Sequence, residues 1–252
     1  MRKLKRNERK RSFRWLQTIF ALTLSNSMKT FVYGDSFSHH KECKCPQDQM
    51  WYAPLVKGDL VDRTRSGQST AETFLLAIND AVQEPASRFV LGSPLLFCRM
   101  PIYKDQLYDH EQITSGTVDD CFPFFGTHSL EKHLHVSLFH HTLVWSQYLA
   151  NVLSFAHIAR HHEHQFVITH MGTPASEHIT RGHPLILPLL KQTTKIPEYI
   201  DQKHSCPTVC QRAGILPWDH AEYGSHGHHS REGQQHYGTY IANMIRERNL
   251  WN

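Results

Sequence analysis

A serine at residue 36 follows directly on a glycine and an aspartate, and this short block is the most informative candidate for chemistry in the sequence. The residues before it, Thr30 to Tyr33, are β-branched, apolar and aromatic, which predicts a buried strand. Open α/β sheets place their chemistry at the carboxyl ends of parallel strands, where Ser36 would lie. Backbone N–H groups at the start of a following helix could then help to hold an oxyanion. The alternative is an ordinary turn, because glycine, aspartate and serine all favour turns.

The elements that would position this serine are indicated by the remaining apolar patterns. Further strands are predicted at Asp59–Thr64, Ser87–Gly92 and Gln165–Thr169, and helices at 70–83, Leu134–His161 and from Ser230 onward. The stretches 93–130 and 172–217 show no clear period and are predicted to be irregular. The order of strands and helices predicts an α/β fold with three layers (α/β/α), in which helices cover both faces of a parallel, flavodoxin-like sheet of about four to five strands.

Two of the predicted helices begin with residues that favour an N-cap. Ser69 precedes a run of apolar residues at helical spacing, and Glu72 follows three residues later, which is a capping-box pattern. Ser230 precedes the last helix and places Gly233 in its first turn. We therefore expect each serine to cap the helix that follows it.

Three segments then occur in one order along the chain. Gly34-Asp35-Ser36 ends the first predicted strand, Ser66-Gly67 follows the second, and the segment 227–234, which contains His228 and Gly233, opens the last helix. This arrangement resembles the SGNH/GDSL hydrolase superfamily, whose nucleophile lies in an N-terminal Gly-Asp-Ser block. The final segment is similar to the C-terminal block of that superfamily, a histidine followed by a short turn, a glycine and the last helix.

The resemblance implies a role for each matching residue. Ser36 would be the nucleophile and His228 the general base, because a serine hydroxyl reacts at neutral pH only when an imidazole takes its proton. The backbone N–H groups of Ser36 and Gly67 would stabilise the oxyanion of a tetrahedral intermediate. His228 is preferred because it lies five residues before Gly233, as in the family, and the neighbouring His229 is the alternative base.

The sequence departs from the family pattern at two places. The family's third block carries Gly-x-Asn-Asp, but the third strand here ends in Leu91-Gly92-Ser93-Pro94, so Ser93 is the substitute we consider for the asparagine donor. The family also places an aspartate about three residues before the histidine, and position 225 is a serine. Asp219 and Glu222 are the candidate acids, and a backbone carbonyl that holds His228 in a Ser-His dyad is the other possibility.

The resemblance implies a serine-dependent ester hydrolase that transfers an acyl group from a small ester to water. The substrate would be a small-molecule ester or glycan, such as a carbohydrate acetyl or lipid ester, and no cofactor or metal is expected. One alternative is a metal-binding protein, because the chain has 21 histidines, and His39, His40, Cys43, Cys45 and the histidines of 226–229 would be neighbours in the predicted fold. Another is a degenerate hydrolase fold used for binding, since the asparagine and aspartate are missing.

The first 27 residues differ in composition from the rest of the chain. Eight lysines and arginines lie within the first 14 positions and account for the formal net charge of +4, so we expect no nucleic-acid partner. An apolar run from Trp15 to Leu24 then gives the outline of a secretory signal. The rival interpretation is that the start codon at Met1 is misassigned, and that Met28 is the true beginning of a single domain over 28–252.

The two interpretations imply different compartments. A genuine segment 1–27 predicts a secreted or membrane-associated protein, and a start at Met28 predicts a cytoplasmic one. The six cysteines are compatible with disulfides if the chain is exported.

Overall fold

The computed structural model describes residues 28–65, 68–93, 99–101, 121–123, 141–172, 184, 186–216 and 228–251. The predicted N-terminal extension 1–27 lies outside these residues, as does most of the predicted insert 93–130. Within the described residues, no helix combines the length and the apolar character that crossing a membrane requires.

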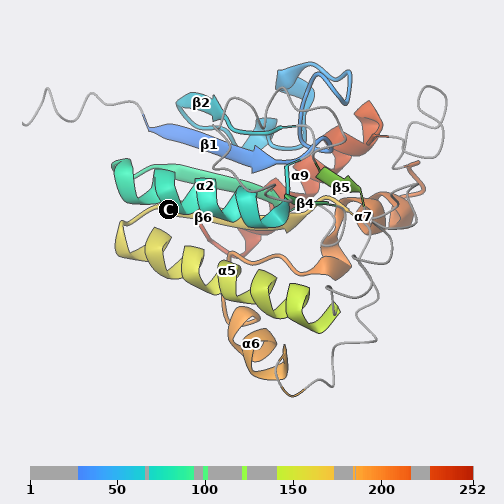
Figure 1. Ribbon diagram of the computed structural model, residues 1–252. Helices are drawn as coiled ribbons and strands as arrows, with labels where there is room; N and C mark the ends of the chain where they lie inside the picture. Colours follow the sequence, from blue (N-terminus) through green and yellow to red (C-terminus); the bar gives the residue numbers. More distant parts are fainter. Residues whose placement is uncertain are drawn as a thin grey trace, which may run out of the picture.

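A four-stranded sheet forms the centre of the molecule (Figure 1), and all of its neighbouring strands are parallel. The strands lie in the order β2 (Asp59–Asp62), β1 (Lys29–Gly34), β3 (Arg88–Ser93) and β6 (Gln165–His170). Gly34 pairs with Gly92, and Ser93 pairs with His170. The carboxyl ends of β1, β3 and β6 therefore meet at one edge of the sheet.

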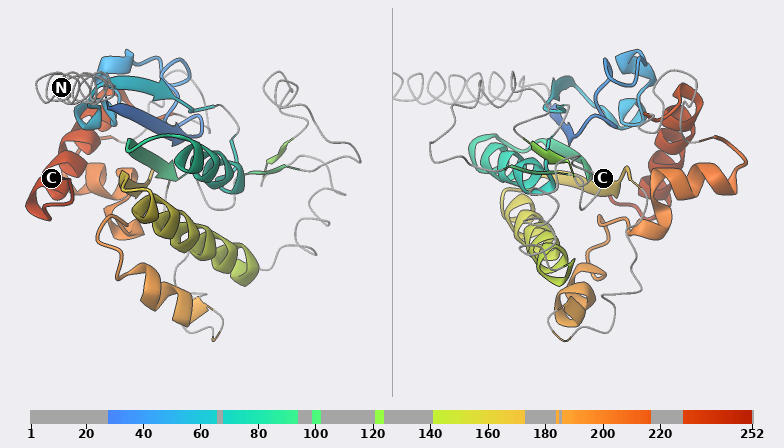
Figure 2. Two further views of the ribbon diagram at one scale, coloured as in Figure 1. Left: turned by 90° about the vertical axis from the view of Figure 1, so that its left-hand side faces the viewer. Right: turned by 45° about the vertical axis from the view of Figure 1, so that its right-hand side comes forward.

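Alternate residues of the strands face two separate cores, as expected where a parallel sheet is buried on both faces. Phe31, Phe89 and Phe166 lie in one core, which α2 (Thr70–Gln83), α5 (His141–His161) and α6 (Ile186–Thr193) cover. Val32, Val90 and Val167 lie in the other core, which α7 (Cys206–Arg212), α9 (Arg231–Glu247) and the segment 45–55 cover. In the right-hand view of Figure 2, α2 and α5 lie on one side of the sheet and α9 on the other. The predicted three-layer fold is confirmed.

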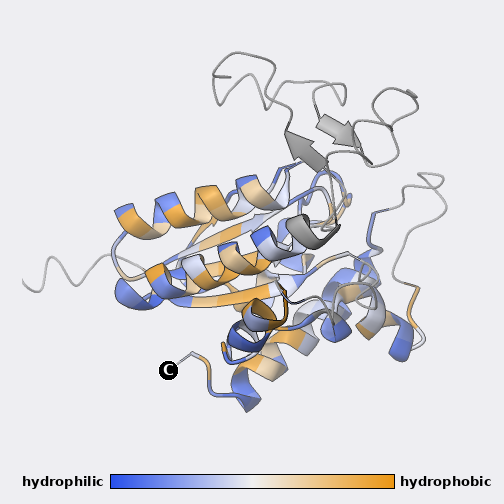
Figure 3. Ribbon diagram, turned by 60° about the horizontal axis from the view of Figure 1, so that its bottom comes forward, coloured by the Kyte–Doolittle hydropathy of each residue, from blue (hydrophilic) through white to orange (hydrophobic). Residues whose placement is uncertain are grey.

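The predicted helix caps are confirmed as well. The Ser69 hydroxyl accepts a hydrogen bond from the N–H of Glu72 at 3.1 Å, and the helix that follows has the predicted bounds of 70–83. The Ser230 hydroxyl accepts from the N–H of Gly233 at 3.0 Å and begins α9. Colouring by hydropathy shows apolar strands between helices of mixed character (Figure 3), which agrees with helices that bury one face only.

The structure describes regular elements within both stretches that were predicted to be irregular, and it corrects the prediction for 172–217. Ser93 is the last residue of β3, and within 93–130 the short strands β4 (Arg99–Pro101) and β5 (Cys121–Pro123) form an antiparallel pair. Two helices, α6 and α7, lie within 172–217. Both carry a proline in the first turn, where no intrahelical N–H bond is lost and the fixed φ suits a helix. The sequence prediction was wrong for 172–217 because helices of eight and seven residues are too short to show a clear apolar period.

Candidate active site

Ser36 lies in a tight turn directly after β1. The N–H of Ser38 donates to the Asp35 carbonyl at 2.9 Å, which closes the turn, and the N–H of Phe37 donates to Asp35 Oδ1 at 3.0 Å. Ser36 itself is only 4% exposed. Its hydroxyl and its backbone N–H form no hydrogen bond with any described residue. The N–H groups of Phe37 and Ser38 are therefore bonded within the turn, whereas the hydroxyl and the N–H of Ser36 can bind a ligand.

The glycine of the Gly-Asp-Ser block is required by close packing. A Cβ at Gly34 would lie 2.5 Å from the Ser38 hydroxyl oxygen, and a Cβ at the paired Gly92 would lie 2.7 Å from Trp51 Cζ2. The indole N–H of Trp51 donates to the Ser38 hydroxyl at 3.2 Å. Neither glycine has a positive φ. The absence of side chains at Gly34 and Gly92 thus leaves space for the side chains of Ser38 and Trp51, whose hydrogen bond stabilises the turn.

The residues that flank the second block contact the same edge of the sheet. Ser66 and Gly67 lie outside the described residues. The N–H of Arg65 donates to the Gly34 carbonyl at 3.0 Å, and the side-chain amide of Gln68, turned so that its nitrogen faces the carbonyl oxygens, donates to the same carbonyl at 2.7 Å. Both neighbours of the 66–67 pair are thereby tied to the residue two places before Ser36.

The histidine block packs against the residue that follows the serine. The ring centroid of Phe37 lies 5.9 Å from that of His228 and 5.2 Å from that of His229. His228 is half-buried, whereas His229 is buried and its Nε2 lies 2.6 Å from the carbonyl oxygen of Met171, just after β6. Because a carbonyl only accepts, His229 Nε2 carries a proton and donates it to this bond. That nitrogen cannot act as a base while the bond is intact.

The candidate acids Asp219 and Glu222 lie outside the described residues, as do His226 and Ser225. The group that orients His228 therefore stays a prediction. The structure brings Phe37, the residue after Ser36, into contact with the two histidines, which are far from it in the sequence.

Ser93 reaches the same edge of the sheet, with its side chain on the face that α5 covers. It is 1% exposed and interacts with the buried hydroxyl of Tyr148. The Tyr148 and Tyr199 hydroxyl oxygens each lie 3.2 Å from Nε2 of His170, the residue paired with Ser93 in the sheet. We call these four residues the Ser93 network. No sequence pattern predicts this network, since Tyr199 falls in a stretch that was predicted to be irregular.

His170 in this network should make the stability of the fold depend on pH. Burial lowers the pKa of His170 to about 4, and the charge of Asp201 opposes this shift only in part. The folded state therefore favours the neutral ring, so its contribution is complete above the unfolded pKa of about 6.5 and is lost as the pH falls toward 4. We expect a loss of about 3 kcal/mol of unfolding free energy over that range.

Urea unfolding of wild type and His170→Gln at pH 7, 6 and 5 measures this effect. The variant should show a shallower loss of stability with falling pH, and the exposed His161→Gln should keep the wild-type slope. Equal slopes in wild type and His170→Gln would contradict the assignment.

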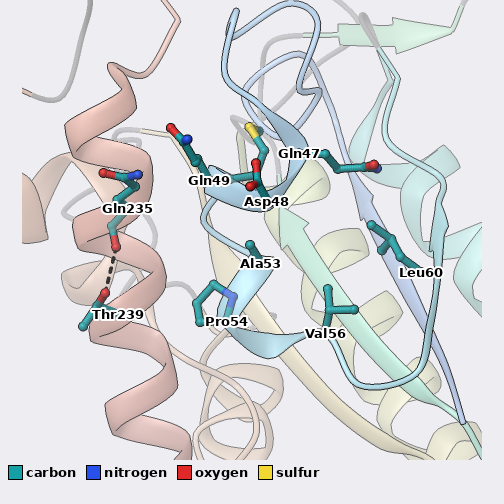
Figure 4. Close-up of a pocket in the computed structure, with 10 residues that line it drawn as sticks. Gln47, Asp48, Gln49, Ala53, Pro54, Val56, Leu60, Gln235 and Thr239 are labelled. Carbon is teal, nitrogen blue, oxygen red and sulfur yellow. Dashed lines mark hydrogen bonds between the residues drawn. The ribbon is translucent and has the colours of Figure 1, made fainter.

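A groove of about 860 Å³ lies between α9 and the segment 47–56 (Figure 4). Its polar residues are Gln47, Asp48, Gln49, Gln235 and Thr239, and its apolar residues are Met50, Ala53, Pro54, Val56 and Leu60. The Gln47 amide nitrogen donates to Asp62 Oδ2 at 3.1 Å, and Asp62 ends β2. One wall of the groove therefore reaches the edge of the sheet at which β2 ends.

The metal-binding alternative finds no site in the part of the chain that the structure describes. No three His, Cys, Asp or Glu side chains among those residues are arranged to hold a metal ion. His39 and His40 are neighbours, with ring centroids 5.4 Å apart, and Nδ1 of His40 lies 3.5 Å from Asp62 Oδ2. Cys43, Cys45, Cys206 and Cys210 are free thiols.

Comparison with known proteins gives similarity at the level of structure alone. No protein-family model and no curated protein matches the chain. The structure is similar to that of TesA, with 12% identity, a TM-score of 0.47 and coverage of 88% of this chain and 99% of that one. It is also similar to the psychrotrophic esterase EstA from Pseudoalteromonas sp., with 7% identity, a TM-score of 0.43 and coverage of 87% of this chain and 97% of that one. A lipase/acylhydrolase from Enterococcus faecalis is similar as well, with 12% identity, a TM-score of 0.40 and coverage of 88% of this chain and 96% of that one.

Proposed function

We propose that the protein is a serine-dependent ester hydrolase that transfers the acyl group of a small ester to water. The observation that carries this proposal is the state of Ser36. A buried turn at the carboxyl end of β1 holds a hydroxyl and an N–H that bond to no described residue, and the half-buried His228 packs against the next side chain. These are the parts that acyl transfer through a serine needs.

The reaction would proceed in two steps, acylation of Ser36 and hydrolysis of the acyl-serine. Ser36 Oγ attacks the ester carbonyl carbon while His228 takes the hydroxyl proton, and the tetrahedral intermediate collapses with loss of the alcohol, to which His228 returns the proton. Water then attacks the acyl-serine, again with His228 as base, and releases the carboxylic acid and the free Ser36. The oxyanion of both intermediates would accept from the N–H of Ser36 and from that of Gly67, and each such donor typically contributes about 10²–10³-fold in rate.

The Ser93 hydroxyl is a further candidate donor for the oxyanion. Its engagement with Tyr148 supports a role in fixing the carboxyl end of β3, and donation to the oxyanion would require its proton to turn toward Ser36. Asp219 and Glu222 stay the candidate acids beside His228, and a carbonyl acceptor is the alternative.

Inhibition of p-nitrophenyl acetate hydrolysis separates the proposed function from the metal-dependent alternative. We expect a fluorophosphonate to inactivate the full chain in a time-dependent manner, with protection by substrate, and a chelator to leave the rate unchanged. Hydrolysis that resists the fluorophosphonate and disappears after dialysis against a chelator would contradict the proposal. Absence of hydrolysis and of inactivation in folded protein would favour the degenerate fold used for binding.

A further inference from the structure

Gln234, in the first turn of α9, is a polar side chain in an apolar core. It is fully buried on the face of α9 that contacts Trp51. Burial of an amide costs free energy unless its donors and acceptors are bonded, so a buried glutamine indicates specific partners. The hydrogen bonds of Gln234 identify these partners.

The amide of Gln234 joins three segments of the chain. Its Nε2 donates to the carbonyl of Phe37 at 2.8 Å and to the sulfur of Cys43 at 3.4 Å. Its Oε1 accepts from the N–H of Trp51 at 3.2 Å. The side chain of Gln234 is therefore bonded to Phe37 in the turn that carries Ser36, to Cys43 in the loop after that turn, and to Trp51.

The thiol of Cys43 extends this contact to Ser36 itself. Its sulfur lies 3.3 Å from the carbonyl oxygen of Ser36 and 3.4 Å from that of Phe37. Burial raises the pKa of the Cys43 thiol, so it stays protonated and its single hydrogen can be donated to either of these carbonyls. Both carbonyls of the turn thus point toward the pair formed by Cys43 and Gln234, which we call the amide–thiol clamp.

The clamp fixes the orientation of the two peptide groups after Ser36. The carbonyl and the N–H of a trans peptide point in opposite directions. With the carbonyls of Ser36 and Phe37 held on one side, the N–H groups of Phe37 and Ser38 point to the other, where both bond to Asp35. The turn is therefore held from two sides, and the direction of the Ser36 side chain follows from it.

The same helix start also carries the histidine. His229 is bonded to Met171, Ser230 caps α9, and Gln234 follows in the first turn. The clamp therefore links the turn of Ser36 to the rigid element that holds His228, and sets the separation between nucleophile and base. Misplacement by about 1 Å in such a pair can cost about 10²-fold in rate.

We propose that Gln234 is a positioning residue for the hydrolysis, and that it acts with Cys43 to hold the Ser36 turn at a fixed place against the helix that follows His228. The inference rests on the proposed function. Gln234 does not touch the reacting atoms, and its effect is on turnover through the geometry of Ser36.

Two substitutions at Gln234 and two controls test this role. Gln234→Glu is nearly isosteric and keeps the acceptor for Trp51 but replaces the donor to Phe37, and Gln234→Met removes both and serves if the first variant does not fold. Gln211→Glu makes the same exchange at an exposed position of α7. Ala159→Gly weakens α5, which covers the opposite face of the sheet from α9, and gives a variant of lowered stability with an intact site.

Turnover and labelling give the first readout. In the Gln234 variants we expect kcat for p-nitrophenyl acetate and the rate of fluorophosphonate labelling to fall together by about 10- to 100-fold, with KM within about threefold of wild type. Both controls should keep wild-type values. A wild-type kcat in the Gln234 variants, or a loss no larger than that of Ala159→Gly, would overturn the inference.

Amide hydrogen exchange gives a second readout that does not depend on activity. The N–H groups of Phe37 and Ser38 should exchange at least about tenfold faster in Gln234→Glu than in wild type or Gln211→Glu. Equal exchange would overturn the clamp. A wild type that is not labelled by the fluorophosphonate would instead contradict the proposed function, and faster exchange at residues 37 and 38 would still support the clamp.

Discussion

Replacing Ser36 by alanine should lower kcat/KM for p-nitrophenyl acetate by about 10⁴- to 10⁶-fold while the fold is retained. Without the hydroxyl no acyl-serine can form, and only the oxyanion donors and the binding of the substrate remain to assist water. The substitution removes a single oxygen that bonds to no described residue, so the expected change in stability is small. Steady-state kinetics together with a urea unfolding curve measure both effects.

Ser38→Ala is the matched control for this prediction. It removes the same atom from a serine in the same turn, but the Ser38 hydroxyl accepts from the indole N–H of Trp51 at 3.2 Å. The substitution leaves that buried donor without an acceptor, which costs about 1–3 kcal/mol of unfolding free energy, and kcat/KM of the folded protein should fall far less than in Ser36→Ala because the nucleophile is retained. The opposite pattern, with Ser38→Ala inactive and Ser36→Ala active, would contradict Ser36 as the nucleophile.

The two adjacent histidines should respond in opposite ways to substitution by alanine. His228→Ala removes the base and should lower kcat by about 10³- to 10⁴-fold with little effect on stability. The half-buried position of His228 also predicts that added imidazole restores part of the lost rate. His229→Ala breaks the bond to the Met171 carbonyl and should lower the unfolding free energy by about 1–3 kcal/mol with a much smaller effect on kcat.

Kinetics at several imidazole concentrations and thermal unfolding of both variants measure this difference. Rescue by imidazole of His229→Ala, with full activity of His228→Ala, would assign the base to His229, which would then have to act through Nδ1. The prediction is a contrast between the two variants, so a general loss of stability in both of them would not produce the expected result.

The sheet and its capped helices could be predicted because their signals are local. The strand ending at Gly34 is a continuous apolar run, and Ser69 and Ser230 precede helices with regular apolar spacing. Each of these features needs only neighbouring residues to be recognised. The position of Ser36 at the carboxyl edge follows directly once the strand is assigned.

The parts that were missed depend on residues distant in the sequence. Gln234 counts as polar in a hydropathy pattern, although its spacing from Tyr237 and Ile241 places it on the buried face of α9, and only the contacts with Phe37 and Trp51 explain it. The Ser93 network forms because α5 packs against the sheet beside β6 and Tyr199 pairs with Ile168. No pattern within a single segment predicts such contacts.

The most direct test of the account is the site at which a fluorophosphonate attaches to the full chain. After labelling and proteolysis, mass spectrometry should locate a single adduct on Ser36, and His228→Ala should slow its formation while Ser36→Ala prevents it. An adduct on Ser38, Ser93 or another residue, or folded protein that carries no adduct, would contradict Ser36 as the nucleophile.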